Sequence, residues 1–347
     1  MHPSVRRRRR GFSVVELLVA MAIIVTLIAL LVVAVERAMR GGQEAQTQFL
    51  MGSIEQGLVQ FRSDHGYLPP VLGRGGTGGA AGGTIGFARD VLAPPANAAG
   101  QQGWSSLTTI ADYLLGYGDR SADGYGVIGS PPYANPNAVG VEEFPLLGLR
   151  SPGPDGGWGS VLNPRTTQGV SAGVYAARNP GDAKVFPTAA GNAITIPGRV
   201  YGPYLEIKDT RALGALVGSD ANGNPTIAFA GEIDNFDAYP KVVCDYWGAP
   251  ILYYRRPYLG SDPAKQNLNL NLGDVVALRP WEVPPGQDVD GLADASLDIS
   301  GGDRTTTREL IAAEFALLSS GPDRAVNLGV RRDRDGINED NIVKVGR

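Results

Sequence analysis

The first strong pattern in the chain is an apolar run close to the N-terminus. Residues 12–35 contain a single charged residue, Glu16, and the stretch from Leu17 to Val35 contains none. As an α-helix the run would be about 36 Å long, enough to cross the roughly 30 Å hydrocarbon layer of a membrane. A buried core helix would normally show a polar face and capping residues, which this run lacks. The pattern therefore predicts a membrane-spanning helix over 12–35.

The helix is expected to continue beyond the membrane, because no proline occurs between Phe12 and Pro69. Four apolar residues recur at helical spacing on the more polar continuation, namely Leu50, Ile54, Leu58 and Phe61. Two consecutive prolines, at 69 and 70, then end the helix. We therefore expect residues 36–70 to be amphipathic, with the apolar stripe packed on a globular domain.

Five consecutive arginines, Arg6 to Arg10, precede the apolar run and are expected to hold this end in the cytoplasm while the rest of the chain crosses the membrane. A secretory signal peptide has a similar plan, but its apolar region is usually about 7–15 residues long. The run here is longer and contains an acid. Since an ionised carboxylate at mid-depth in a bilayer costs on the order of 2.5–3.5 kcal/mol, Glu16 needs a partner.

Composition limits the chemistry of the rest of the chain. One cysteine and two histidines are too few for an internal disulfide or a Cys/His zinc site. The formal net charge of −4 includes the five N-terminal arginines, so the remainder is more acidic, which argues against nucleic acid as a partner. A G-x-S-x-G match at Gly169–Gly173 has no histidine after it to complete a hydrolase triad. We therefore expect no catalytic residues.

The residues around Gly11 suggest the missing partner of the acid. A basic leader, Gly11, Phe12 and a glutamate as the fifth residue after Gly11 resemble the class III leader of type IV pilins and type II secretion pseudopilins. The resemblance implies that a prepilin peptidase cuts after Gly11 and methylates the new N-terminus at Phe12. It also implies that Glu16 pairs with the Phe12 amine of a neighbouring subunit, which would select one axial register. A Glu16 side chain that only reaches towards the membrane surface is the alternative.

Two C-terminal segments extend the resemblance. Asp245–Tyr254 is similar to the D-P-W-G-x-x-Y turn of the major pseudopilins, with Tyr246 where proline is usual. The segments Phe315–Asp323 and Arg331–Val343 resemble the S-x-G-P-D…N-D-D-I ending, which forms a calcium-binding loop in that family. Calcium takes about six to eight oxygen ligands. The candidate donors of side-chain oxygens are Ser319, Asp323, Asp333, Asp335, Asn338 and Asp340.

The support for these candidates differs. Three of the candidates occupy matching positions of the family motif, namely Ser319, Asp323 and Asp340. Glu339 stands where the N-D-D-I part of the motif has its first aspartate. Asp333 and Asp335 lie in residues that the family motif does not contain. Their assignment as ligands is therefore supported only by the ability of carboxylate oxygens to bind calcium. A solvated tail, in which nearby arginines balance the acids, is the alternative.

The stretch between the helix and these segments is rich in glycine and proline. Within it, Ser105–Tyr117 is expected to form a short helix and Ala193–Ile207 to form antiparallel strand structure, as is Val242–Tyr254 further on. The whole chain is then expected to have an α+β, pilin-like fold: a long N-terminal helix packed on a small antiparallel β-sheet, with a long loop-rich insertion. The expected divisions are a leader peptide (1–11), a transmembrane helix (12–35), the amphipathic half of the same helix (36–70), a variable insertion (71–240) and a C-terminal β-sheet region with the calcium loop (241–347).

The resemblance implies a non-enzymatic filament subunit, a pseudopilin-like component of a type II protein secretion system. It would assemble as a homo-oligomer in a helical filament from the bacterial inner membrane, with its N-terminus cytoplasmic and its C-terminal domain periplasmic. Its partners would be the prepilin peptidase, other pseudopilins and the inner-membrane assembly platform. The alternatives are a type IV pilus subunit for adhesion, motility or DNA uptake, and a membrane-anchored binding protein or enzyme.

Overall fold

The computed structural model describes residues 14–65, 68–69, 71, 95, 97–115, 175–176, 183–187, 193–199, 203–220, 224–234, 236, 239–256, 270–290, 305–332 and 336–346. The chain divides into two compact units, Met1–Gln46 and Thr47–Arg347. Each unit is described by itself below.

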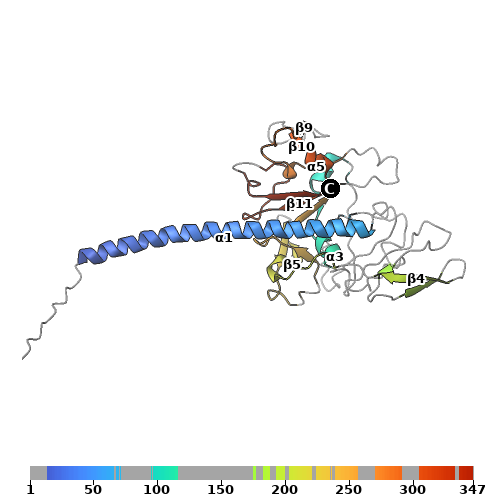
Figure 1. The fold of residues 1–347 in the computed structure, drawn as a ribbon, viewed down its shortest axis with the longest axis horizontal. Helices are drawn as coiled ribbons and strands as arrows, with labels where there is room; N and C mark the ends of the chain where they lie inside the picture. Colours follow the sequence, from blue (N-terminus) through green and yellow to red (C-terminus); the bar gives the residue numbers. More distant parts are fainter. Residues whose placement is uncertain are drawn as a thin grey trace, which may run out of the picture. The chain divides into compact units, whose positions relative to one another are not determined.

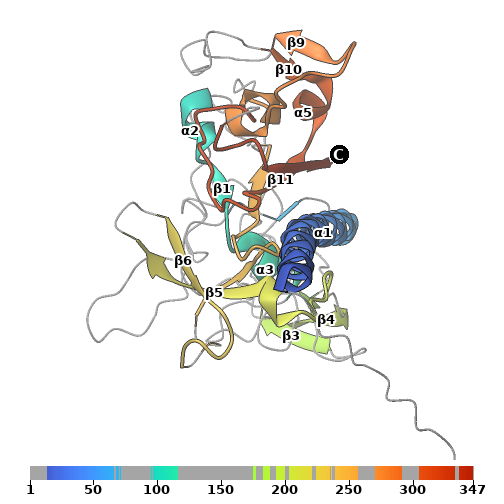
Figure 2. The same cartoon turned by 90° about the vertical axis from the view of Figure 1, so that its left-hand side faces the viewer.

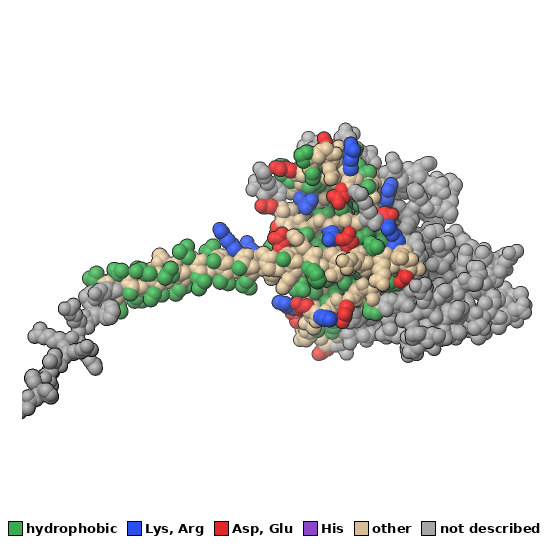
Figure 3. Space-filling view, in the orientation of Figure 1, with side chains coloured by type: hydrophobic (Ala, Val, Ile, Leu, Met, Phe, Trp, Pro, Cys, Tyr) green, Lys and Arg blue, Asp and Glu red, His purple; other side chains and the backbone are tan. Residues whose placement is uncertain are grey.

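One continuous α-helix, α1 (Val14–His65), contributes to both units (Figure 1). In the first unit its large apolar side chains are exposed, from Val14 to Met39, and they form the long green surface of Figure 3. Among the described residues this is the one helix long and apolar enough to cross a membrane. The long apolar N-terminal helix predicted from the sequence is therefore confirmed. Within residues 14–46, the described part of the first unit, nothing buries the apolar stretch of the helix, in contrast to a core helix.

The second unit is built on a four-stranded antiparallel sheet. Its strands are β1 (Ser105–Ser106), β8 (Leu252–Arg255), β11 (Phe315–Ser319) and β12 (Ile342–Gly346), in the order β1-β8-β11-β12. Figure 1 and Figure 2 show β11 beside the second half of α1. In β11, Leu317 is paired with Tyr253 of β8 on one side and with Lys344 of β12 on the other.

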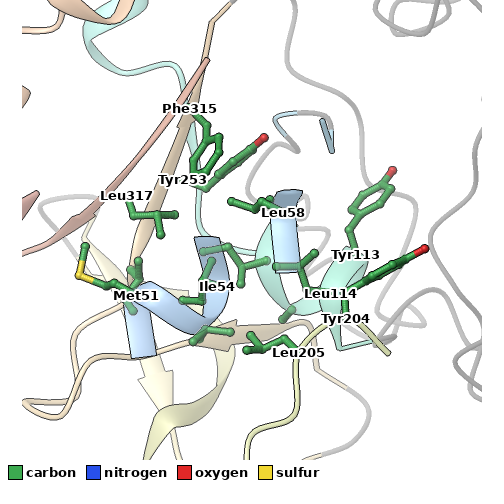
Figure 4. Packing of buried hydrophobic residues seen from close by; sticks show 14 of the residues in the cluster. Met51, Ile54, Leu58, Tyr113, Leu114, Tyr204, Leu205, Tyr253, Phe315 and Leu317 are labelled. Carbon is green, nitrogen blue, oxygen red and sulfur yellow. The ribbon is translucent and has the colours of Figure 1, made fainter. Parts of the chain in front are cut away.

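One face of this sheet packs against the second half of α1. The predicted stripe of Leu50, Ile54, Leu58 and Phe61 is buried there. Figure 4 shows Ile54 and Leu58 facing Tyr253, Phe315 and Leu317 of the sheet, with Leu114 of α3 (Thr109–Leu114) beside them. This packing confirms an α+β fold in which a long helix is seated on a small antiparallel sheet.

The other face of the sheet is covered as well. Two short 3-10 helices, η3 (Leu272–Asp274) and η4 (Val276–Leu278), pack there with α5 (Arg308–Ala312). Their apolar side chains contact Tyr254, Ala316 and Leu318. As a result every residue of β11 is buried, and the apolar sequence FALLS does not alternate with polar residues.

Smaller sheets complete the described structure. The strands β5 (Leu213–Ser219), β6 (Pro225–Ala228) and β7 (Lys241–Val243) form one sheet in the order β6-β5-β7. A second contains β9 (Asp288–Asp290) and β10 (Thr305–Thr307), and a third contains β2 (Tyr175–Ala176), β3 (Ala183–Pro187) and β4 (Ala193–Arg199). The other short helices are α2 (Ala98–Gln102) and η1 (Thr210–Ala212).

Two local predictions need correction. The expected helix over Ser105–Tyr117 begins only at Thr109, because Ser105 and Ser106 form an edge strand beside β8. The Ser106 hydroxyl accepts the N–H groups of Thr108 and Thr109, which lets the chain leave the strand and enter the helix. In the expected strand region Ala193–Ile207, the strand ends at Arg199.

The segment 71–240 was expected as a variable insertion, and part of it belongs to the same core as α1. Trp104, Ile110 and Tyr113 are buried in that core, and Tyr204 packs on Phe61. These described parts of the segment, around Trp104–Tyr113 and Tyr204, therefore help to seat the helix.

Candidate functional sites: the N-terminal segment and the C-terminal loop

Two regions carry the residues predicted to function. In the N-terminal segment, Gly11 and Phe12 lie outside the described residues, so the structure does not test cleavage or methylation there. Glu16 lies in the first turn of α1, and its side chain is not described. Its neighbours Val15 and Leu17 are 68% and 56% exposed. The next charged residue along the helix is Glu36, so α1 itself supplies no nearby cation for Glu16.

The second half of α1 is tied to the domain by polar contacts as well as by its apolar stripe. Arg62 forms an ion pair with Glu314, and Glu55 Oε2 lies 3.1 Å from Lys344 Nζ on β12. Near the end of the helix, the Tyr204 hydroxyl donates to Asp64 Oδ2 at 2.9 Å. These contacts join α1 to the sheet edge and to the segment around Tyr204.

The C-terminal loop begins with a tight turn after β11. Gly321 has a φ of +66°, and a Cβ atom there would collide with the Asp340 carbonyl oxygen. Only glycine fits such a close approach combined with a left-handed backbone. Arg324, three residues later, is the non-glycine residue with a positive φ (59°) among those the structure describes. The turn therefore holds the two ends of the loop against each other.

This turn brings two of the predicted calcium ligands together. The Asp323 N–H donates to Asp340 Oδ2 at 3.2 Å, and Asp323 Oδ1 accepts the Ala325 N–H at 2.8 Å. Partial burial raises the pKa of the Asp340 carboxyl, and the negative charge of Asp323 raises it further, while the N–H bond from Asp323 opposes the shift. The hydrogen bond from Asp323 to the Asp340 carboxylate shows that these two residues lie side by side.

Two other predicted ligands already have protein partners. The Ser319 hydroxyl donates to Asp245 Oδ2 at 2.7 Å and accepts the Gly321 N–H at 3.3 Å. Asn338 Oδ1 accepts from the Asn327 N–H and from the Asn341 side chain, and its amide donates to the carbonyls of Asn327 and Val330. With these four bonds the Asn338 side chain is fully engaged in organising the loop. Asp333 and Asp335 lie outside the described residues.

The described residues fit a hard cation such as calcium in part. Asp323 and Asp340 are neighbours that a backbone-to-carboxylate hydrogen bond links. Elsewhere in the loop, the buried Oδ1 of Asn341 has no hydrogen-bond partner in the part of the chain that the structure describes. Such oxygens are the donors that calcium prefers. Within the same described residues, no group of three or more His, Cys, Asp or Glu side chains gathers to hold a metal. Hydroxyl, amide or carbonyl oxygens would therefore have to complete any coordination sphere.

Two residues at this loop were not predicted as part of it. Asn341 follows Asp340 directly. Its side-chain amide, next to a predicted ligand, was the signal in the sequence that could have included it in the loop. Asp245 was expected only as the first residue of a turn motif, and in the structure it caps this turn, because its Oδ1 accepts the N–H groups of Trp247 and Ala249. Its second contact, with Ser319, spans 74 positions, so no local sequence pattern indicates it.

The comparisons with known proteins bear on the N-terminal segment. Residues 6–32 match the family model described as the prokaryotic N-terminal methylation motif. No curated protein and no solved structure matches the chain. The matched stretch contains Gly11, Phe12 and Glu16 and much of the apolar part of α1. The chain therefore carries a class III prepilin leader, and this finding supports a protein of the pilin or pseudopilin type.

Proposed function

We propose that the chain is a structural filament subunit, a pseudopilin-like component of a type II protein secretion system of the bacterial inner membrane. One observation carries the proposal: the methylation motif over 6–32 overlaps the start of an exposed, apolar helix long enough to cross a membrane. The motif suggests processing by a prepilin peptidase and assembly into a filament. Other pseudopilins and the membrane assembly platform would be the remaining partners.

The proposed assembly step depends on two charges. Cleavage between Gly11 and Phe12 releases a new N-terminal amine, which stays positively charged after methylation. In a filament core without water, this amine and Glu16 would each be a buried charge, and an unpaired buried ion costs several kcal/mol. Pairing the Phe12 amine of one copy with Glu16 of the next offsets both costs and selects one axial register.

The domain would be carried on the filament by the second half of α1. Its apolar stripe is buried against the sheet, and the Arg62–Glu314 and Glu55–Lys344 pairs add polar contacts. With this attachment, subunits that pack through α1 would display the sheet and its covering layer. The domain would be periplasmic while the chain is in the membrane, because the arginines before the helix favour a cytoplasmic N-terminus.

The C-terminal loop is proposed to bind calcium through Asp323 and Asp340. The ion would supply positive charge that offsets the repulsion between these carboxylates, and it would fix the loop that joins β11 to β12. A thermal melt of the full-length protein in detergent tests this. Excess calcium should raise the melting temperature, and Asp340→Ala should abolish the gain. An unchanged melting curve with excess calcium would refute calcium binding.

The same motif fits a type IV pilus subunit, and deletion separates the two functions. A pseudopilus subunit predicts loss of exoprotein secretion, whereas a pilus subunit predicts loss of surface filaments that antibodies against this chain label. Processing is tested by mass spectrometry of the mature protein from its native host. The expected N-terminus is methylated Phe12, and recovery of the chain with Met1 still attached would contradict the proposal.

A further inference from the structure

The glycines of α1 differ in whether the surrounding chain requires a glycine. A Cβ atom on Gly57 would lie 2.9 Å from the Tyr204 carbonyl oxygen, so the helix approaches its neighbour too closely there for a side chain. At Gly41 and Gly42, in contrast, no described atom lies within 4 Å of the position that a Cβ atom would occupy. Packing within the described chain therefore explains Gly57 but not the pair Gly41–Gly42.

A pair of glycines weakens the interior of an exposed helix. Relative to alanine, each glycine lowers the helix equilibrium about four- to fivefold, because its backbone loses more freedom when it is fixed. Gly41 and Gly42 are both exposed and lie in the same turn of α1, far from its ends at Val14 and His65. The two penalties therefore fall on one point of the helix, and sharp helix bends are commonly found at such glycines.

The residues around this pair, 36–46, receive less support than the helix on either side. Before them, the stretch from Leu17 to Val35 is uncharged, and the water-free interior of a membrane strongly favours backbone hydrogen bonds within a helix. After them, Thr47 is the first residue of α1 that the structure describes as buried, and its hydroxyl accepts the Tyr246 N–H at 3.2 Å. Because packing supplies most of the stability of protein helices, we expect 36–46 to be the weakest interior part of α1.

We propose that α1 contains a joint at Gly41–Gly42, where the helix opens and bends between its apolar span and the half that is seated on the sheet. Opening at this point breaks no packing contact of the two glycines with the described chain. The joint lets the angle between the two halves of the helix change while each half keeps its own contacts. It goes beyond the proposed function, since it applies to a pseudopilus subunit and to a pilus subunit alike.

Hydrogen–deuterium exchange of the full-length protein in detergent, followed by mass spectrometry, tests the joint. The amides of residues 43–46 bond to carbonyls four residues earlier, so opening at the pair exposes them to solvent. We expect these amides to exchange about tenfold faster, or more, than those of residues 50–60 in the seated half. Gly41→Ala combined with Gly42→Ala should then slow the exchange of 43–46 by roughly 15- to 30-fold.

Gly52→Ala is the matched control, because it makes the same change on the same helix within the seated half. A Cβ atom at this position would make an ordinary contact, 3.5 Å from Lys344 Nζ, so the variant is expected to fold. Exchange at 43–46 in this variant should stay within about twofold of wild type, since separated sites act independently.

Spin labels on either side of the pair measure the bend itself. Labels attached at Arg37→Cys and Gln56→Cys would lie about 29 Å apart along a straight helix, whereas bending at the joint shortens and broadens the distribution of distances. Both positions are exposed, and Cys244 is fully buried, so a label does not reach it. The double alanine change should narrow the distribution towards one distance near the straight-helix value.

Three results would overturn the inference. The first is equal protection of 43–46 and 50–60 in the wild-type protein, and the second is a single narrow label distance near the straight-helix value. The third is unchanged exchange in the double alanine variant, which together with weaker self-association in detergent would show that the glycines instead admit a second helix. None of these results bears on leader cleavage or on secretion, so the proposed function is tested separately.

Discussion

The strongest test of the packing around α1 compares two phenylalanines on the same helix. Phe61 is fully buried and meets the rings of Tyr113 and Tyr204 edge to face, with ring centres 5.9 and 5.5 Å away. Truncating a buried phenylalanine to alanine typically costs about 3–5 kcal/mol, and each such ring pair accounts for about 0.5–1.5 kcal/mol. Phe61→Ala should therefore lower the free energy of unfolding of the domain by about 3–5 kcal/mol.

Phe49 provides the matched control, because it is the same residue type on the same helix and is 78% exposed. Phe49→Ala should change the free energy of unfolding by less than about 0.5 kcal/mol. Denaturant unfolding of the full-length protein in detergent, followed by tryptophan fluorescence, measures both values. Similar small losses for the two variants would show that the predicted apolar stripe does not seat the domain on α1.

Further predictions concern the loop and the sheet edge. Gly321→Ala should destabilise the domain by more than Gly286→Ala in thermal melts, because both glycines have positive φ but only Gly321 faces Asp340 at close range. Lys344→Ala should cost less than about 1 kcal/mol in denaturant unfolding, and the loss should shrink in high salt, since the pair with Glu55 is partly exposed. The raised pKa of Asp340 means that the folded state holds its proton more tightly than the unfolded chain, so this group lowers stability as the pH rises above the ordinary carboxylate value of 3.8. In EDTA, Asp340→Asn should therefore raise the melting temperature near pH 7 and have little effect below about pH 4, and equal effects at both pH values would contradict this.

Local periodicity was sufficient to predict α1. The apolar run of the first unit and the later stripe of four residues both repeat at helical spacing, and the structure has one helix from Val14 to His65. The turn at Asp245–Gly248 was also predicted, because Asp245–Tyr254 is similar to a known turn motif, and Gly248 has the positive φ that such a turn requires. The leader peptide was recognised because the basic run, Gly11, Phe12 and Glu16 lie at fixed distances from one another along the sequence.

The features that were not predicted from the sequence depend on contacts between segments that lie far apart along the chain. The layer of η3 and η4 has no regular apolar period, and its burial follows from packing against β11. The serines at 105 and 106 read as the start of a helix, yet pairing with β8 makes them a strand. The Asp245–Ser319 bond joins two segments whose individual motifs do not refer to each other.

The central claim is that Glu16 of one copy pairs with the Phe12 amine of another during assembly. Its most direct test measures the fraction of processed protein recovered in filaments from cells that produce Glu16→Gln, with Glu36→Gln as a control on the same helix. The account predicts that both variants are cleaved after Gly11 and that only Glu36→Gln enters filaments at the wild-type level. Normal filament recovery of Glu16→Gln would contradict it.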